Sequence, residues 1–290
     1  MPITEHGGAR LHWRASGAGE PVLMIMGLNA SALGWQRLLP YVADEHEAIV
    51  FDNRGTGRSS PANGLMTMKD LVADALAVLE AAGHERAHVV GASMGGMVAQ
   101  HLALEHRDRV LSLCLCCTTP VGRGGSVGPW RLLTAAALRP FVDPGRSAWV
   151  LAPMLYSERT RREAPHRMDE DLQVRNAHPT PARTTWAQLA AISRHDTRRR
   201  LHELAGIPTT IVHGDSDVLV PTARGRELAD RIPGAELVLI PGAGHLMSTD
   251  NERDSAIAVL DHLEAASAAA TARRGASSRS PRSRARGGAA

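Results

Sequence analysis

Six runs of apolar residues, separated by stretches with helical periodicity, constrain the fold of this chain more than any other feature. They lie at Pro21–Met26, Glu47–Asp52, Ala87–Val90, Arg109–Cys117, Thr209–His213 and Glu236–Ile240. Continuous apolar strands that alternate with helices are typical of a parallel sheet covered on both faces. The sequence therefore predicts an α/β fold, with a mostly parallel central sheet and helices on both faces.

The helices between these runs are predicted from apolar stripes and from their start and stop signals. They span Thr67–Ala82, Met94–His106, Pro221–Arg231 and Glu252–Leu263. Gly83 is a stop signal after the first of them, and Pro221 falls in the first turn of the third. The segment LHWR at Leu11–Arg14 is expected to add an edge strand.

The alternation of strands and helices breaks between about Pro120 and Leu204. In this interval, segments with the pattern of short amphipathic helices, at 130–142, 146–156 and 181–193, are joined by Pro and Gly. A helical insertion at this point would lie as a cap over one end of the sheet. The predicted organisation is a core from 1–119, a helical cap from 120–204, a second part of the core from 205–264, and a disordered Arg-rich tail from 265–290.

The formal net charge of +3 reflects this tail more than the folded part. From residue 265 onward the chain holds six Arg and no acidic residue, which leaves 27 basic and 30 acidic residues in the rest. A segment of Ala, Ser, Gly and Arg cannot build a core, so it is expected to be disordered. Non-specific contact with nucleic acid or an anionic surface would be limited to this tail, and a solubilising extension is the favoured interpretation.

Membrane and secretory roles are disfavoured by the same composition. No apolar run approaches the roughly 20 residues that cross a bilayer, and the N-terminal residues lack the apolar core of a secretory signal. The three cysteines, Cys114, Cys116 and Cys117, share one apolar run and have no second cluster with which to form a disulfide framework or a metal site. A buried strand in a protein of the reducing cytoplasm is the prediction that follows.

The segment Gly91-Ala92-Ser93-Met94-Gly95 follows an apolar strand and enters a helix at once. This is the context that the GxSxG nucleophile elbow requires. Small neighbours are needed because the backbone at the serine is strained. The amides at the start of the following helix would face any anion that forms on an attacked carbonyl.

Two later loops supply partners for the hydroxyl of Ser93. A serine needs a base to take its proton, and that base needs an acid to orient it. Asp215 and Asp217 follow the strand at Thr209–His213, and His245 follows the strand at Glu236–Ile240. Each of these loops lies beyond the carboxyl end of a predicted parallel strand, where open α/β sheets place their sites. The order Ser, Asp, His along the chain is the order expected of this architecture.

From about Ile3 to Leu263 the chain resembles the α/β-hydrolase superfamily. The matching segments are MGLNASALGW, FDNRGTGRSS, AHVVGASMGG, HGDSDVLVP and IPGAGH. The resemblance implies Ser93 as nucleophile, Asp217 as acid, with Asp215 as the runner-up, and His245 as base. It also implies an oxyanion hole formed by the backbone amides of Leu28 and Met94.

The chain departs from the family pattern at Met26-Gly27, where most members have His-Gly. A methionine cannot make the hydrogen bond with which a histidine steadies the oxyanion loop, so Asn29 or Ser31 is expected to hold it. This segment is similar to a subgroup that includes anthracycline-type methyl esterases. The loop at Asp52–Ser60 lacks the Gly-Lys-Ser/Thr ending of a phosphate-binding loop, and the resemblance implies that it is structural.

The aromatic residues of the predicted cap have two interpretations that the sequence leaves open. Trp130, Trp149, Tyr156 and Trp186 either line an apolar substrate pocket or pack the cap helices. Most of the histidines, including His101, His106 and His213, are expected to have structural roles.

The sequence thus predicts a cofactor-independent serine hydrolase that cleaves a carboxylic ester or lactone of a small-molecule substrate through an acyl-enzyme, with no metal. An ester is favoured over an amide because the cap shows no extended peptide groove. Carbon–carbon bond hydrolysis, perhydrolysis and a non-catalytic binding role on the same fold are the alternatives. Dehalogenase or epoxide-hydrolase chemistry would need an Asp at position 93. Substrate, oligomeric state and pathway are not determined by the sequence.

Overall fold

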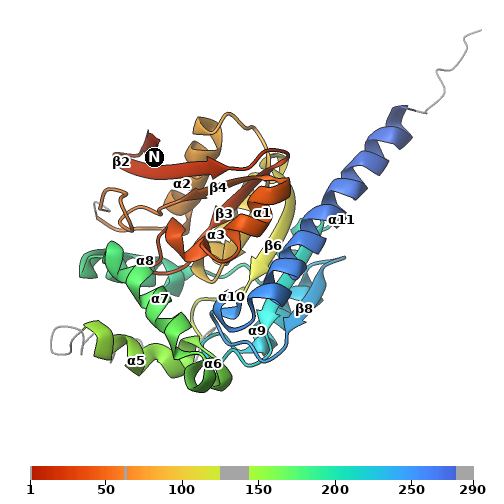
Figure 1. Ribbon diagram of the computed structural model, residues 1–290. Coiled ribbons are helices and arrows are strands. Elements are labelled where there is room, and N and C mark those ends of the chain that lie inside the picture. Colours follow the sequence, from red (N-terminus) through yellow and green to blue (C-terminus); the bar gives the residue numbers. More distant parts are fainter. Residues whose placement is uncertain (1, 62–63, 125–143, 279–290) are drawn as a thin grey trace, which may run out of the picture.

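The computed structural model describes residues 2–61, 64–124 and 144–278, with the side chains of 144–149 and 272–278 excepted. At its centre is an eight-stranded sheet with the strand order β1-β2-β4-β3-β5-β6-β7-β8 (Figure 1). Its strands are β1 (Ile3–His6), β2 (Ala9–Ser16), β3 (Pro21–Ile25), β4 (Glu47–Phe51), β5 (Ala87–Ala92), β6 (Val110–Cys116), β7 (Thr209–Gly214) and β8 (Glu236–Ile240).

The sheet is parallel from β4 to β8, and only β1 and β2 run antiparallel to their neighbours. This confirms the predicted fold class. The segment Leu11–Arg14, predicted to be an edge strand, falls inside β2. It does not form the edge, because β1 pairs with the outer side of β2.

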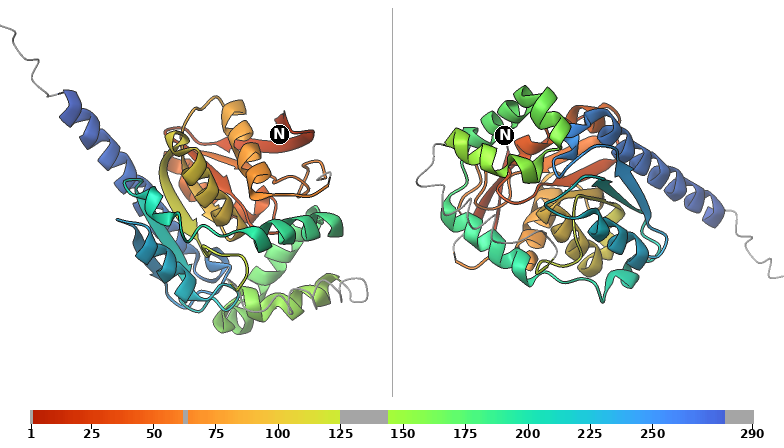
Figure 2. Two further views of the ribbon diagram at one scale, coloured as in Figure 1. Left: turned by 180° about the vertical axis from the view of Figure 1, so that it is seen from behind. Right: turned by 90° about the horizontal axis from the view of Figure 1, so that it is seen from below.

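The helices cover both faces of the sheet (Figure 2). On one face lie α2 (Met68–Ala81), α3 (Met94–Glu105) and α9 (Thr222–Arg231), and on the other α1 (Leu39–Glu45) and α11 (Glu252–Ser278), with α10 (Met247–Asp250) before it. Short 3-10 turns occupy Ala32–Trp35, Arg107–Arg109 and Leu201–Leu204. Thr67 caps α2 through a reciprocal pair of hydrogen bonds with Asp70, which explains why this helix begins where the sequence predicted.

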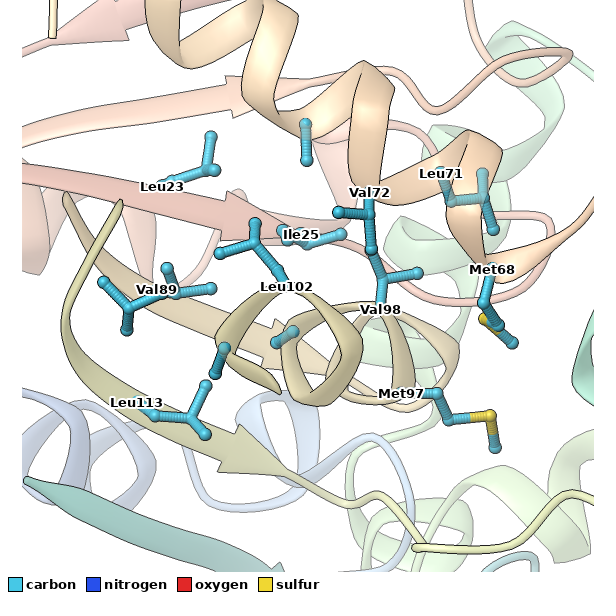
Figure 3. Close-up of a cluster of buried hydrophobic side chains, with 14 of the residues drawn as sticks. Leu23, Ile25, Met68, Leu71, Val72, Val89, Met97, Val98, Leu102 and Leu113 are labelled. Carbon is cyan, nitrogen blue, oxygen red and sulfur yellow. The ribbon is translucent and has the colours of Figure 1, made fainter. Parts of the chain in front are cut away.

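Alternate side chains of the parallel strands β3 to β8 enter two separate cores. In β3, Leu23 and Ile25 pack with α2 and α3 (Figure 3), whereas Val22 and Met24 pack on the α1 and α11 side. All four are fully buried. Burial on both faces is the reason why the strands read as continuous apolar runs.

Four further helices lie together beyond the carboxyl ends of the parallel strands (Figure 1). They are α5 (Pro144–Leu155), α6 (Glu158–Glu163), α7 (Pro165–Ala177) and α8 (Ala182–Arg194). They fall within the range 120–204 that the sequence assigned to a cap, and the helical patterns at 146–156 and 181–193 are confirmed. The pattern at 130–142 lies outside the described residues.

The two ends of this insertion meet each other. Val121 pairs with Asp196 in an isolated bridge, and the amide of Gly122 donates to the carbonyl of His195 at 2.8 Å. The chain therefore leaves the core and returns to it at one point. That residues 120–204 form a separate domain stays a prediction.

The prediction that the chain becomes disordered at residue 265 is wrong for residues 265–278. Helix α11 continues through them to Ser278 and extends away from the sheet (Figures 1 and 2). Alanine is the strongest helix former, so an Ala-rich continuation of an anchored helix stays helical. Ala266 is buried, and Ser267 donates a hydrogen bond to Glu20. Residues 279–290 lie outside the described residues.

A buried polar network joins α11 to the sheet. The imidazole of His262 contacts the hydroxyls of Thr210 and Ser112, each at 2.9 Å, and Ser112 also contacts Nδ1 of His88 at 2.8 Å. Burial and, to a smaller extent, the nearby His88 together lower the pKa of His262 to about 4. The neutral imidazole is therefore the form that the folded protein stabilises.

We expect this network to weaken the fold in acid. The unfolded chain protonates His262 near its ordinary pKa of 6.5, whereas the folded protein does so only near 4. As the pH falls from 6.5 to 4, the free energy of unfolding should decrease by up to about 1.4 kcal/mol per pH unit, because the unfolded chain binds the proton more tightly. In His262→Gln, the free energy of unfolding measured with urea at pH 7, 6 and 5 should therefore vary less with pH than in the wild type. His166→Gln, at an exposed position on α7, is the control, and equal slopes in both variants would contradict the prediction.

Candidate active site

Ser93 lies in a strained turn between β5 and α3. Its backbone has φ 55° and ψ −119°, a conformation that L-residues rarely adopt. A side chain at Gly95 would come within 2.0 Å of the carbonyl oxygen of Ile25, and one at Gly91 within 2.5 Å of the carbonyl of Gly95. The two glycines are thus required by the close approach of strand and helix, and the turn presents the Ser93 side chain beyond the end of the strand.

The structure brings Ser93, His245 and Asp217 together from three loops. The distance from Ser93 Oγ to His245 Nε2 is 3.0 Å, and the distance from His245 Nδ1 to Asp217 Oδ2 is 2.8 Å. His245 and Asp217 are buried, and Ser93 is half-buried. The parallel strands β5, β7 and β8 end at the same edge of the sheet, and each of these loops follows one of them.

The environment of Asp217 keeps it ionised. Burial alone would raise its pKa, but the charge of His245 and hydrogen bonds from His213 and His245 hold the pKa well below its ordinary value. Its other oxygen, Oδ1, accepts the backbone amides of Leu219 and Val220, both at 2.9 Å. An ionised carboxylate beside Nδ1 holds the ring proton there, so the Nε2 lone pair faces the hydroxyl of Ser93.

The loop that carries His245 is held on both sides. The amide of Gly244 donates to the buried carboxylate of Asp250 at 2.7 Å, and the amide of Leu246 donates to the carbonyl of Leu155 at 2.8 Å. The same carboxylate accepts the amide of Ser157 at the start of α6. The position of the imidazole therefore depends on the helical insertion as well as on the sheet.

The oxyanion loop, residues 26–29, follows β3 and lies against Ser93. A side chain at Gly27 would come within 3.0 Å of Ser93 Cβ, so glycine is needed for this approach. Met94 is the first residue of α3, where backbone amides have no partner within the helix. The amides of Leu28 and Met94 thus belong to the two segments that flank the hydroxyl, and their role as an oxyanion hole stays a prediction.

The family model of the alpha/beta hydrolase fold matches residues 20–252. The chain belongs to this family. Hydrolase activity and a small-molecule substrate are supported by that membership. Within the described residues, every helix is too short or too polar to cross a membrane.

Relatives of this hydrolase carry different activities in their names. A protein of Azorhizobium caulinodans named "Putative carbamate hydrolase RutD" is 31% identical over 250 residues, which cover 86% of this chain and 92% of the relative. A thermophilic esterase from Thermogutta terrifontis is 27% identical with a TM-score of 0.79, covering 91% of this chain and 97% of the esterase. Est816, described as an N-acyl homoserine lactone degrading enzyme, is 27% identical with a TM-score of 0.76, covering 90% of this chain and 99% of that protein.

The hydrolase holds its oxyanion loop without the histidine that most members have. The side chain of Asn53 donates to the carbonyl of Met26 at 2.9 Å. The amide of Asn29 donates to Oε1 of Gln188 at 3.0 Å, and Asn29 Oδ1 accepts the hydroxyl of Thr185 at 2.8 Å. The loop is therefore anchored on both sides of Leu28.

Of the two residues expected to replace the histidine, Asn29 makes contacts that hold the loop. Ser31 instead precedes a 3-10 turn, where its carbonyl accepts the amide of Gly34. The side chain of Met26 lies against Gly34, where a Cβ would come within 2.7 Å of it. Gln188 and Thr185, both buried on α8, were missed by sequence reasoning.

The remaining candidates have structural contacts. Asp215 is exposed and accepts hydrogen bonds from Ser216 and the amide of Gly242, so it stabilises the turn. Asp52 accepts the amides of Ala32 and Arg58, as expected of a structural loop.

Two of the predicted structural histidines have specific partners. His213 is fully buried and donates from Nε2 to the carbonyl of Val220. The same nitrogen lies 3.4 Å from Oδ2 of Asp217, the oxygen that His245 also contacts. His101 contacts His195 at 3.2 Å, beside the point where the insertion returns to the core.

Of the four cap aromatics, Tyr156 has a packing role in the structure. Tyr156 is buried in a small apolar cluster and donates its hydroxyl to Asp171, so it packs α5 against α7. Trp186 is half exposed on α8. Trp130 lies outside the described residues, and the side chain of Trp149 is not among those described.

Proposed function

We propose that this protein hydrolyses a carboxylic ester or lactone of a small molecule through an acyl-enzyme on Ser93. The observation that carries the proposal is the continuous hydrogen-bonded chain from Ser93 through His245 to Asp217. Two relatives, the esterase from Thermogutta terrifontis and Est816, support this substrate class by their names.

In the proposed reaction, Ser93 Oγ attacks the acyl carbonyl while its proton passes to His245 Nε2. The carbonyl oxygen becomes an oxyanion, which the amides of Leu28 and Met94 stabilise. The imidazolium, balanced by ionised Asp217, then gives its proton to the departing alkoxide as the tetrahedral intermediate collapses. A water activated by the same imidazole releases the carboxylic acid and restores the hydroxyl.

The decisive experiment combines covalent labelling with a substrate panel. A fluorophosphonate should modify Ser93, identified by mass spectrometry of the labelled peptide, because only an activated serine reacts readily. Short p-nitrophenyl esters, aliphatic lactones, a simple carbamate and a β-diketone should then be compared. Turnover of esters or lactones, absent in Ser93→Ala, is the expected result.

Other outcomes of this panel would replace the proposal. An unlabelled Ser93 together with an inactive protein would indicate a binding role on the same fold. Turnover of the carbamate or the β-diketone alone would move the substrate class to the activity in the name of the Azorhizobium caulinodans relative, or to carbon–carbon bond cleavage.

Loss of the hydrogen bond between the Asn29 amide and Gln188 on α8 should slow the reaction. In Gln188→Leu the amide of Asn29 loses its acceptor, so the neighbouring Leu28 amide is held less firmly. We expect kcat to fall by up to the roughly 10²–10³-fold that loss of an oxyanion donor costs, with a smaller change in KM.

Two control variants test this explanation. Gln188→Glu keeps an acceptor oxygen and should recover part of the rate. Arg183→Ala, at an exposed position on the same helix, should behave as wild type. An unchanged kcat in Gln188→Leu would show that the loop does not depend on α8.

A further inference from the structure

Three residues other than glycine have a left-handed backbone in the part of the chain that the structure describes. They are Asn29, Ser93 and Cys117, with φ of 58°, 55° and 46°. Each lies just beyond the carboxyl end of a parallel strand, β3, β5 and β6 respectively. Such backbones cost free energy and gather at functional sites. Asn29 and Ser93 belong to the site already described, whereas the proposed reaction gives Cys117 no part.

Cys117 lies beside the acid and the base. One donor atom from each of Cys117, Asp217 and His245 lies within 4.8 Å of the other two, and all three residues are buried. The amide of Cys117 donates to the carbonyl of Val212 at 2.9 Å, which fixes its backbone against β7. The other two cysteines differ, because Cys114 and Cys116 contact each other at 3.9 Å between their sulfurs.

We propose that Cys117, Asp217 and His245 form a binding site for a thiophilic divalent metal ion such as Zn²⁺, and that its occupation switches off Ser93. A thiolate, an imidazole nitrogen and a carboxylate oxygen are the three ligand types that zinc takes in proteins. The fourth position would be filled by water. The donor atoms are already close, so binding requires the side chains to converge around the ion and not a rearrangement of the sheet.

Occupation of this site would remove the base by changing its tautomer. At rest, Nδ1 of His245 carries the ring proton and faces Asp217. When the metal takes the Nδ1 lone pair, the ring proton moves to Nε2, and the thiol proton of Cys117 leaves to the solvent. Nε2 then has no lone pair to accept the proton of Ser93. Inhibition should therefore be complete, and removal of the ion should reverse it.

The test uses Cd²⁺ as a spectroscopic probe and Zn²⁺ as the inhibitor, on the full chain after prolonged incubation with the ion. Wild type should show the ultraviolet band of a cadmium–thiolate bond, saturating at one ion per chain. Ester hydrolysis should fall in parallel and recover with EDTA. In Cys117→Ala the band should vanish, and the Zn²⁺ concentration for half inhibition should rise by more than the roughly 10–100-fold that loss of an outer-shell partner costs.

Two further variants make the result specific. Cys116→Ala removes a buried thiol one residue away and should keep both the band and the inhibition, each measured against its own rate without metal. Cys117→Ser serves if the alanine variant does not fold, and should also lose the band. The absorption band is measured without turnover, so it tests the site even if the proposed ester hydrolysis is wrong. A wild type without the band, or equal inhibition of Cys117→Ala, would overturn the proposal.

Discussion

Replacing Ser93 with alanine is expected to lower kcat for an ester substrate by on the order of 10⁶-fold, as loss of the nucleophile does in other serine hydrolases. The reason is that no acyl-enzyme can form without Oγ, while Asp217 and His245 remain in place. The hydroxyl is half-buried and is not part of either core, so the free energy of unfolding should change by about 1 kcal/mol or less. Steady-state kinetics with a p-nitrophenyl ester, together with urea unfolding, measures both quantities.

A matched serine shows that the loss is specific to the turn. Ser216 is exposed close to Asp217, and its hydroxyl contacts Asp215. Ser216→Ala should therefore retain wild-type kcat and wild-type labelling by a fluorophosphonate. If Ser93→Ala kept more than a small fraction of the wild-type kcat, the hydroxyl at this position would not be the nucleophile.

The site residues that could be predicted from sequence patterns are those that directly follow a strand. Ser93, Asp217 and His245 each follow a recognisable apolar run, and parallel strands bring their carboxyl ends to one edge. The sequence therefore predicted both the sheet and the three side chains that meet there. Only the positions of the strands and their parallel arrangement were needed, and continuous apolar runs that alternate with helices indicate both.

Contacts between residues far apart in the sequence could not be predicted from the pattern of apolar runs. Asn29 and Gln188 are 159 residues apart, and a helical stripe does not show which loop its polar residue will face. Cys117 was grouped with its sequence neighbours in one buried strand, yet its left-handed backbone carries it out of the strand and toward Asp217. Composition was equally misleading at residues 265–278, where low complexity suggested disorder although alanine favours the helix that forms.

Replacing Asp217 with asparagine is expected to lower kcat by about 10⁴-fold through the wrong histidine tautomer. Oδ1 of Asp217 accepts two backbone amides at 2.9 Å, so the carbonyl oxygen of an asparagine must occupy that place. Its NH₂ group then faces His245, whose Nδ1 has to become an acceptor. The ring proton moves to Nε2, and the ring can no longer take the proton of Ser93. Steady-state kinetics of the purified variant measures the loss.

Asp215 provides the matched control because it lies two residues away and was the other candidate acid. Its carboxylate is exposed and stabilises the turn through Ser216 and Gly242. Asp215→Asn should therefore keep kcat close to wild type and lose only a little stability. A large loss of kcat in Asp215→Asn, with Asp217→Asn active, would transfer the role of the acid to Asp215. The proposed metal site also distinguishes Asp217 from Asp215, because of these two only Asp217 belongs to the cluster with Cys117. Asp217→Asn should therefore weaken the cadmium–thiolate band, and Asp215→Asn should leave it unchanged.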